Sequence, residues 1–166
     1  MAILAAVDGE RTSNSVVTVG HDLAEAYGDT LVVLHVMAQD HFDAVRKRTT
    51  EDRTKLATGD AGLPFIQYGA GSDTDGYFLD QAVEDAASVA ADVVERAIEH
   101  ARNVETVGRV GDVTTEVVDE AVERNARYVV VGGRKRSPAG KALFGSTTQS
   151  VLLTADRPVV TVMHDR

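Results

Sequence analysis

The segment Thr30–Val36 has the sequence TLVVLHV, in which leucine and valine occupy both faces of a potential strand. A strand that is apolar on both faces is typical of a parallel sheet covered by helices on either side. Short apolar runs occur again on both sides of this segment in the chain. They are Ala2–Val7 (AILAAV), Val104–Gly108 (VETVG), Arg127–Gly132 (RYVVVG) and Pro158–Met163 (PVVTVM). The sequence therefore predicts five strands.

Segments with helical periodicity separate these runs. A first helix is expected from about Ser13 to Tyr27, where Gly28 ends it, and Asp112 is well placed to cap a later helix. A short last helix must stop before Arg157-Pro158. The predicted core stripes are Val16, Gly20, Leu23, Ala24 and Tyr27; Leu79, Ala82, Val83, Ala86, Ala90, Val93, Val94, Ala97 and Ala101; Val113, Val117, Val118, Ala121 and Val122; and Val151 with Leu152.

The alternation of strands and helices predicts a single α/β domain over residues 1–166. Right-handed crossovers then lead to a doubly wound, three-layer α/β/α sandwich of the Rossmann-like type. We expect a five-stranded parallel sheet in the order 3-2-1-4-5. In such a sheet, ligands bind outside the carboxyl ends of the strands, where the strand order reverses.

An insertion at about residues 38–77 does not fit the short connections of such a fold. Asp43–Leu56 is charged and only weakly helical in pattern, and Gly69–Gly76 (GAGSDTDG) is typical of a flexible turn. The insertion could be a lid over the carboxyl edge of the sheet, a surface for a partner, or a mobile tether. A solvated insertion without a function is the alternative.

The composition is acidic, with 26 acids against 17 bases, a net charge of −9 and a pI near 4.9. This charge disfavours nucleic acid as a partner. Asp outnumbers Glu by 16 to 10, and Arg outnumbers Lys by 13 to 4. High salt screens the self-repulsion of such a surface, so the composition predicts a halophilic protein, as a haloarchaeon would make. An ordinary acidic protein is the alternative.

The absence of cysteine excludes disulfides and thiolate metal sites. The run Ala2–Val7 has no basic segment before it, and it is too short for a signal peptide or a membrane span. The sequence therefore predicts a cytoplasmic protein that does not bind membranes. The five histidines show no metal-ligand spacing, so no metal site is expected.

Three features are expected to meet at the switch point of the sheet. Asp8 follows the first strand, where it could bind a ligand amino group or only cap the next helix. Glycines and four bases lie together in Gly132–Lys141, which suits a phosphate, although a solvated basic loop is the alternative. Gly145–Thr148 opens the last helix and could bind an anion, although N-capping by Ser146 or Thr147 explains it as well.

A P-loop is rejected, because it would need glycine at position 135 and Ser or Thr at position 142, where the chain has Lys135 and Ala142. Three other pieces of sequence resemble the universal stress protein family. They are Val7-Asp8, then Leu34-His35-Val36, and a loop that matches G-x2-G-x9-G-[ST] over Gly132–Ser146 except that Lys135 replaces the second glycine. The closing run Arg157–Val162 is similar to that family as well.

The resemblance implies an adenine nucleotide alpha hydrolase-like fold that binds ATP or a related adenine nucleotide, with or without Mg²⁺, in stress response or signalling. It implies that Asp8 and the backbone at Val36 meet adenine, and that Gly145, Ser146 and Thr147 hold the phosphates. The loop from Gly132 would lie against ribose and phosphates. The full predicted nucleotide site is Ala6, Val7, Asp8, Val36, Val131, Gly132, Arg134, Lys135, Gly145, Ser146 and Thr147.

Lys135 could block the approach of phosphates to the backbone, or it could bring a cation to them. A nucleotide-free dimeric interaction module is therefore the alternative function. Catalysis is expected to be absent or limited to slow ATP hydrolysis, because no carboxylate besides Asp8 is evidently placed near the phosphates. A homodimer is expected through the last strand, 158–163, because an apolar edge strand favours antiparallel pairing across a two-fold axis.

Overall fold

The computed structural model describes residues 1–10, 13–58, 73–134 and 145–164. Within these residues the chain forms a sheet and flanking helices in alternation. The elements are β1 (Ala2–Val7), α1 (Ser13–Tyr27), β2 (Thr30–Ala38), α2 (Gln39–Thr58), α3 (Asp73–Ala97), β3 (Val104–Gly111), α4 (Val113–Glu123), β4 (Ala126–Arg134), α5 (Ser146–Thr154) and β5 (Val159–His164).

The five strands form one parallel sheet in the order β3-β2-β1-β4-β5, which confirms the predicted topology. In the register of the central strands, Val7 of β1 pairs with His35 of β2, and Ala6 pairs with Val131 of β4. The carboxyl ends of β2, β1 and β4 are therefore neighbours at one edge of the sheet. The strand order reverses beside β1 at this edge.

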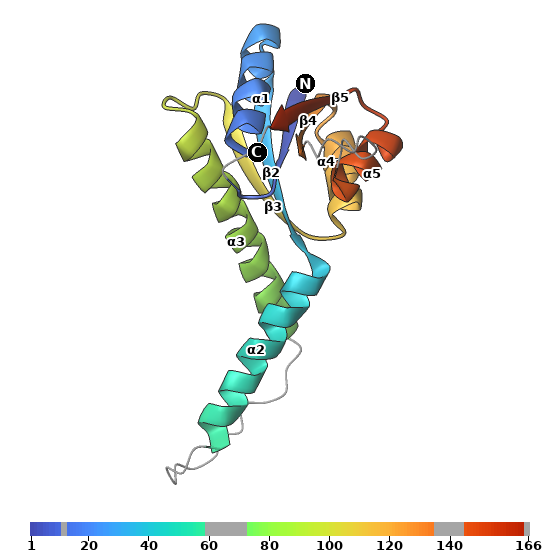
Figure 1. Cartoon of the computed structure of the whole chain (residues 1–166). Helices are drawn as coiled ribbons and strands as arrows, with labels where there is room; N and C mark the ends of the chain where they lie inside the picture. The colour runs from blue at the N-terminus through green and yellow to red at the C-terminus, as the bar shows by residue number, and fades with distance from the viewer. Residues whose placement is uncertain (11–12, 59–72, 135–144, 165–166) are drawn as a thin grey trace.

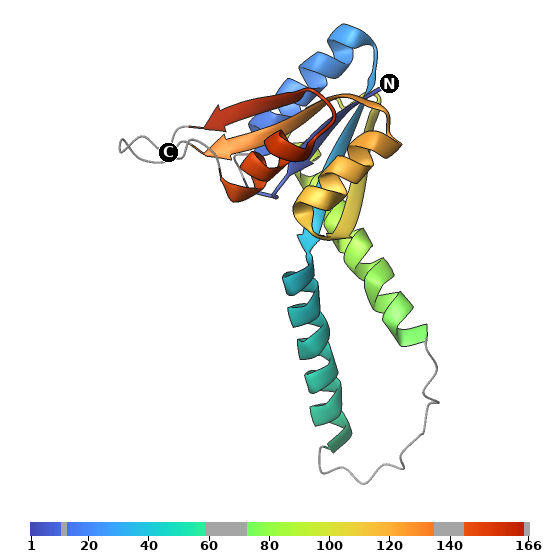
Figure 2. The same ribbon diagram turned by 90° about the vertical axis from the view of Figure 1, so that its right-hand side faces the viewer.

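Helices cover both faces of the sheet, as Figures 1 and 2 show: α1 and α3 on one face, α4 and α5 on the other. Alternate residues of β1 point to the two layers. Ile3 and Ala5 pack in the cluster with α1 and α3, whereas Ala2 and Leu4 pack in the cluster with α4 and α5. The core thus has two halves separated by the sheet.

Five residues predicted to be core lie at the surface instead: Tyr27 is 48% exposed, Leu79 45%, Val122 53% and Leu152 36%, and Ala101 is exposed as well. The sheet covers a narrower strip of each helix than the apolar periodicity indicates. The described residues of β5 are only half buried, because β5 is an edge strand.

The long helix ends earlier than expected. Ala101 lies beyond the end of α3 at Ala97, because the chain turns back toward β3 through Asn103, which has a φ of 53°. None of the helices in the described part of the chain is both long and apolar enough to span a membrane.

The predicted insertion contains a long helix rather than only loop. α2 leaves the carboxyl end of β2 and projects away from the sheet (Figures 1 and 2). Among residues 39–49 of α2, Phe42 is the buried side chain. The predicted flexible turn is wrong for residues 73–76, which begin α3, while residues 59–72 lie outside the described residues. Because α2 packs so little, the sequence shows no apolar stripe that would have predicted it.

Candidate functional site

A cavity of about 500 Å³ lies at the carboxyl edge of the sheet, where the strand order reverses. The ends of β1, β2 and β4, the start of α1, and residues of α4 and α5 line it. Its lining residues are Ala6, Val7, Asp8, Ser13, Val16, Leu34, His35, Val36, Val113, Val117, Val131, Gly132, Gly133, Gly145, Ser146, Thr147, Thr148 and Val151. This is the position that the doubly wound fold favours for a ligand.

Most of the predicted nucleotide site comes together around this cavity. Arg134 is the last residue of β4, and its side chain lies outside the described part of the structure, so its predicted role stays a prediction. Lys135 lies outside the described residues, so both effects ascribed to it stay predictions. The predicted residues that do line the cavity are Ala6, Val7, Asp8, Val36, Val131, Gly132, Gly145, Ser146 and Thr147.

The predicted nucleotide site leaves out half of the lining residues. The core valines of α4 and α5 gave no signal, because nothing in the apolar pattern shows which buried side chains border an open space. The Leu34-His35-Val36 motif pointed to this region, but we selected only Val36 from it. The lining residues that the predicted site leaves out are Ser13, Val16, Leu34, His35, Val113, Val117, Gly133, Thr148 and Val151. Of these, Gly133 and Thr148 belong to the two segments that the sequence analysis had singled out for an anion.

The turn between β1 and α1 holds Asp8 at the cavity. One carboxylate oxygen, Oδ1, accepts hydrogen bonds from the Glu10 N–H (3.0 Å) and from the Ser13 hydroxyl (2.6 Å). The backbone N–H of Asp8 in turn donates to Ser13 Oγ at 3.2 Å. Asp8 therefore shapes the turn before α1.

A glycine and an arginine hold the same turn in place. Gly9 has a φ of 82°, and a Cβ atom there would lie 2.7 Å from Cγ1 of Val89 in α3. The Arg96 guanidinium of α3 donates to the Gly9 carbonyl oxygen at 3.1 Å. The position of Asp8 thus depends on contacts from a neighbouring helix as well as on its own strand.

The end of β1 is also tied to β2. The His35 Nδ1 atom lies 2.9 Å from the Val7 carbonyl oxygen. Because a carbonyl can only accept, Nδ1 carries the hydrogen and donates it. This bond joins two strand ends that line the cavity.

The amino end of α5 also lines the cavity. Gly145 is the N-cap residue, and no side chain supplies a capping hydrogen bond to this helix. Capping by Ser146 or Thr147 is therefore wrong as an explanation of this segment: both lie inside the first turn and are exposed. The first N–H groups of a helix have no acceptor within the helix, and with the helix dipole they favour an anion.

Thr148 fixes this helix start against the sheet. Its side chain is buried, and its hydroxyl donates to the Gly132 carbonyl oxygen at 2.6 Å. A Cβ atom added to Gly145 would meet no atom of the described residues within 4 Å. The helix start is thus held against the sheet without crowding from these residues beside Gly145.

The two sides of the cavity differ in polarity. Asp8 is the one carboxylate among the described lining residues, and it lies on the β1 side. The helix start on the other side favours negative charge. Between them the walls are largely apolar, with Leu34, Val117 and Val151 also belonging to the core. The cavity therefore suits a ligand with an anionic end, an apolar body and a hydrogen-bond donor at its other end.

Comparisons with known proteins identify the family to which the chain is similar. The pattern of the universal stress protein family matches residues 1–163. A curated universal stress protein from Mycolicibacterium smegmatis (strain ATCC 700084 / mc(2)155) is 37% identical over 84 residues, which make up 51% of this chain and 27% of that protein. The chain thus matches only a part of the length of that relative.

Solved structures share the fold. A universal stress protein from Archaeoglobus fulgidus superposes with a TM-score of 0.57 at 24% identity, over 97% of each chain. A universal stress protein in complex with cAMP superposes with a TM-score of 0.54 at 19% identity, over 98% of this chain and 96% of that one. Because the family pattern covers nearly the whole sequence and the fold agrees, the chain belongs to the universal stress protein family.

Proposed function

We propose that this protein binds ATP or a related adenine nucleotide in the cavity and acts in stress response or signalling through its bound state. The observation that carries the proposal is the polarity of the cavity. Gly145, Ser146 and Thr147 form a helix start suited to phosphates, and Asp8 offers an acceptor to the adenine amino group. A family member of the same fold was solved in complex with cAMP, which supports an adenine nucleotide here as well.

Binding rather than turnover is the proposed activity. Phosphoryl transfer needs groups that hold a metal ion and position a nucleophile. Among the described lining residues, Asp8 is the one carboxylate, and it follows β1 rather than belonging to the helix start. Mg²⁺, if it accompanies ATP, would therefore be held chiefly by the phosphates. At most slow hydrolysis is expected.

Thermal unfolding with and without nucleotides tests the proposal. We would compare ATP with Mg²⁺, AMP and cAMP, in molar KCl because the composition favours a halophilic protein. A ligand at a hundredfold excess over its Kd stabilises the native state by about 2.7 kcal/mol. A higher unfolding temperature with ATP alone would indicate that the phosphates supply the affinity. An equal increase of the unfolding temperature with AMP would indicate that the adenosine half supplies it. No shift with any of them would contradict the proposal.

Two variants test the assignment of the phosphate end. Gly145→Leu adds a side chain where a Cβ atom would meet no atom of the described residues within 4 Å, so the fold should tolerate it while phosphates lose their approach to the backbone. Ser146→Ala removes a hydroxyl from the first turn of α5. Both should weaken ATP binding by about tenfold, which corresponds to roughly 1.4 kcal/mol. Ser88→Ala removes an exposed hydroxyl from α3, away from the cavity, and is the matched control. Unchanged affinity in both test variants would contradict the site.

We also propose a homodimer through β5. Val160 and Val162 of this edge strand are only partly buried, although they pack against the core. Antiparallel pairing with a second copy across a two-fold axis would cover them and satisfy the strand edge. Sedimentation at micromolar concentration in molar KCl should give twice the chain mass. A monomer under those conditions would contradict this interface.

One observation favours the alternative function, a nucleotide-free dimeric interaction module. α2 projects from the sheet, with mostly exposed side chains over residues 39–49, and none of these residues lines the cavity. A helix with so little packing is suited to contact another protein. This alternative predicts no stabilisation by any nucleotide, and the same thermal experiment decides between the two functions. Either function is proposed for the cytoplasm.

A further inference from the structure

We propose that Ser13 is a positioning residue that orients the Asp8 carboxylate, so that the cavity selects a 6-amino purine over a 6-oxo purine. The inference rests on the proposed nucleotide binding. Its basis is a pair of hydrogen bonds between Ser13 and Asp8 beyond the carboxyl end of β1. No pattern in the sequence had assigned a role to Ser13.

The geometry of the pair is reciprocal. The Ser13 hydroxyl donates to Asp8 Oδ1 at 2.6 Å, and Ser13 Oγ accepts the backbone N–H of Asp8 at 3.2 Å. Ser13 is 3% exposed, whereas Asp8 is exposed at the cavity. A buried hydroxyl with both a donor and an acceptor partner has little freedom to rotate. Together with the Glu10 N–H, which donates to the same Oδ1 atom at 3.0 Å, it holds the exposed carboxylate in one orientation relative to its own backbone.

Other hydrogen bonds hold the turn between β1 and α1 in place. The orientation of the Asp8 carboxylate can therefore change without unfolding of the turn. The Ser13 N–H donates to the Glu10 carbonyl oxygen at 3.0 Å, and Arg96 donates to the Gly9 carbonyl oxygen at 3.1 Å. Neither bond uses the Ser13 hydroxyl. Loss of that hydroxyl should therefore leave the turn in place and remove one of the two described hydrogen bonds to Asp8 Oδ1, while the bond from the Glu10 N–H at 3.0 Å stays.

The carboxylate determines which base is accepted. An ionised carboxylate can only accept hydrogen bonds. The 6-amino group of adenine is a donor and matches it, whereas the 6-oxo group of hypoxanthine is an acceptor and opposes it. Phosphates are repelled from Asp8 and attracted to the start of α5, so a nucleotide should place its base on the Asp8 side. A carboxylate that is free to turn would lose part of this discrimination.

The test compares the dissociation constants of AMP and IMP by isothermal titration calorimetry. The unmodified protein should prefer AMP by about tenfold, the order expected of one hydrogen bond to a charged group at a solvent-accessible position. Ser13→Ala should reduce the preference to about twofold by weakening AMP alone. Ser13→Thr keeps the hydroxyl and should restore the preference.

Thr18→Ala is the matched control. It removes a hydroxyl from the same helix, where Thr18 Oγ1 donates to the Asn14 carbonyl oxygen at 3.0 Å, away from Asp8. It should keep the tenfold preference. If Ser13→Ala unfolds below the assay temperature, Ser13→Cys is measured instead, because it keeps the size and weakens the donor.

The outcomes separate this inference from the proposed function. Binding of AMP with an unchanged AMP-to-IMP ratio in Ser13→Ala would overturn the role of Ser13 and leave nucleotide binding intact. A loss of the ratio in Asp8→Asn, with no further loss in the double variant Asp8→Asn/Ser13→Ala, would show that Ser13 acts through Asp8. Absence of AMP binding in the unmodified protein would overturn the proposed function, and this inference with it.

Discussion

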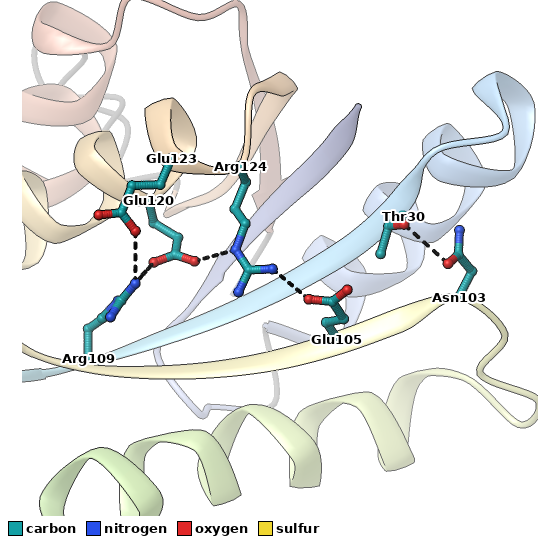
Figure 3. Close-up of polar contacts among 7 residues, drawn as sticks. All are labelled: Thr30, Asn103, Glu105, Arg109, Glu120, Glu123 and Arg124. Atoms are coloured by element: carbon teal, nitrogen blue, oxygen red, sulfur yellow. Dashed lines mark hydrogen bonds and ion pairs between the residues drawn. The ribbon is translucent and has the colours of Figure 1, made fainter. Parts of the chain in front are cut away.

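Arg109 of β3 binds the buried carboxylate of Glu120 in α4, with Nε donating to Oε2 at 2.8 Å. Arg124 donates from its own Nε to the other oxygen, Oε1, at 2.8 Å (Figure 3). Glu120 is 1% exposed, and both arginines also reach more exposed acids, Glu123 and Glu105. The hydrogen bonds that the two guanidinium groups donate to Glu120 raise the pKa of both. One buried carboxylate thus joins α4 to the edge strand β3.

Glu120→Gln should destabilise the protein by about 2 kcal/mol, because it removes charge-assisted hydrogen bonds and sets an amide donor against a guanidinium donor. The penalty stays moderate because the side chains of Arg109 and Arg124 are 38% and 35% exposed and stay hydrated. Glu123→Gln, at a side chain that is 64% exposed, should change the free energy of unfolding by less than about 0.5 kcal/mol. Urea denaturation measures both. An equal decrease in the free energy of unfolding in both variants would contradict the central role of Glu120.

Gly9→Ala should destabilise by about 2–3 kcal/mol, through left-handed backbone strain and overlap with Val89. Gly28 is the matched control, since its φ is 66° but a Cβ atom there would meet nothing within 4 Å. Gly28→Ala should cost only about 1 kcal/mol, from strain alone. The difference between the unfolding midpoints of Gly9→Ala and Gly28→Ala therefore measures the contact between Gly9 and Val89 of α3. No difference would contradict that contact.

Gly108→Ala should cost more than about 3 kcal/mol or prevent folding. A Cβ atom on Gly108 would overlap the backbone carbonyl oxygen of Val83 and the backbone nitrogen of Ala87, so α3 would have to move away from β3. Gly20→Ala is a useful comparison, because its nearest neighbour is the flexible end of the Leu31 side chain at 3.0 Å. That variant should stay within about 1 kcal/mol of the parent, since a gain in helix propensity offsets the crowding. Circular dichroism during urea unfolding would distinguish the two.

The stability of the protein should depend on Asp29 in acid. The hydrogen bond from Arg127, at 2.7 Å, holds the pKa of Asp29 below its ordinary value, and the Met1 ammonium lowers this pKa further. Since the folded state then binds fewer protons than the unfolded state, this contribution is complete above the unfolded pKa of about 3.9. It is lost as the pH falls through the lower folded pKa.

Asp29→Asn should therefore lower stability near neutral pH and reduce the loss below about pH 4. Urea midpoints measured from pH 6 to pH 2.5 give the difference between parent and variant. That difference should be constant above about pH 5 and shrink in acid. A difference that is the same over the whole range would contradict the lowered pKa.

The sequence alone predicted the fold because its signals are local and repeated. Valine and leucine on both faces of 30–36 indicated a covered parallel strand, and right-handed crossovers left few possible strand orders. Asp112 was recognised as a helix cap, and the structure confirms it with a hydrogen bond from the Thr115 N–H at 2.9 Å. Gly28 was recognised as a helix end, and its φ of 66° agrees. Each of these signals depends only on residues that are close together in the sequence.

The sequence also placed Asp8, Gly132 and Gly145 at one edge of the sheet, since the carboxyl ends of parallel strands must meet there. Tertiary structure alone decided that Ser13 bonds to Asp8, that Thr148 bonds to Gly132, and that α2 projects as a helix. The partner of a buried hydroxyl depends on which elements pack together, and a charged helix with little packing leaves no apolar pattern. Periodicity reports which face of an element is buried, whereas the side chains that meet across a cavity are set by contacts between elements distant in the chain.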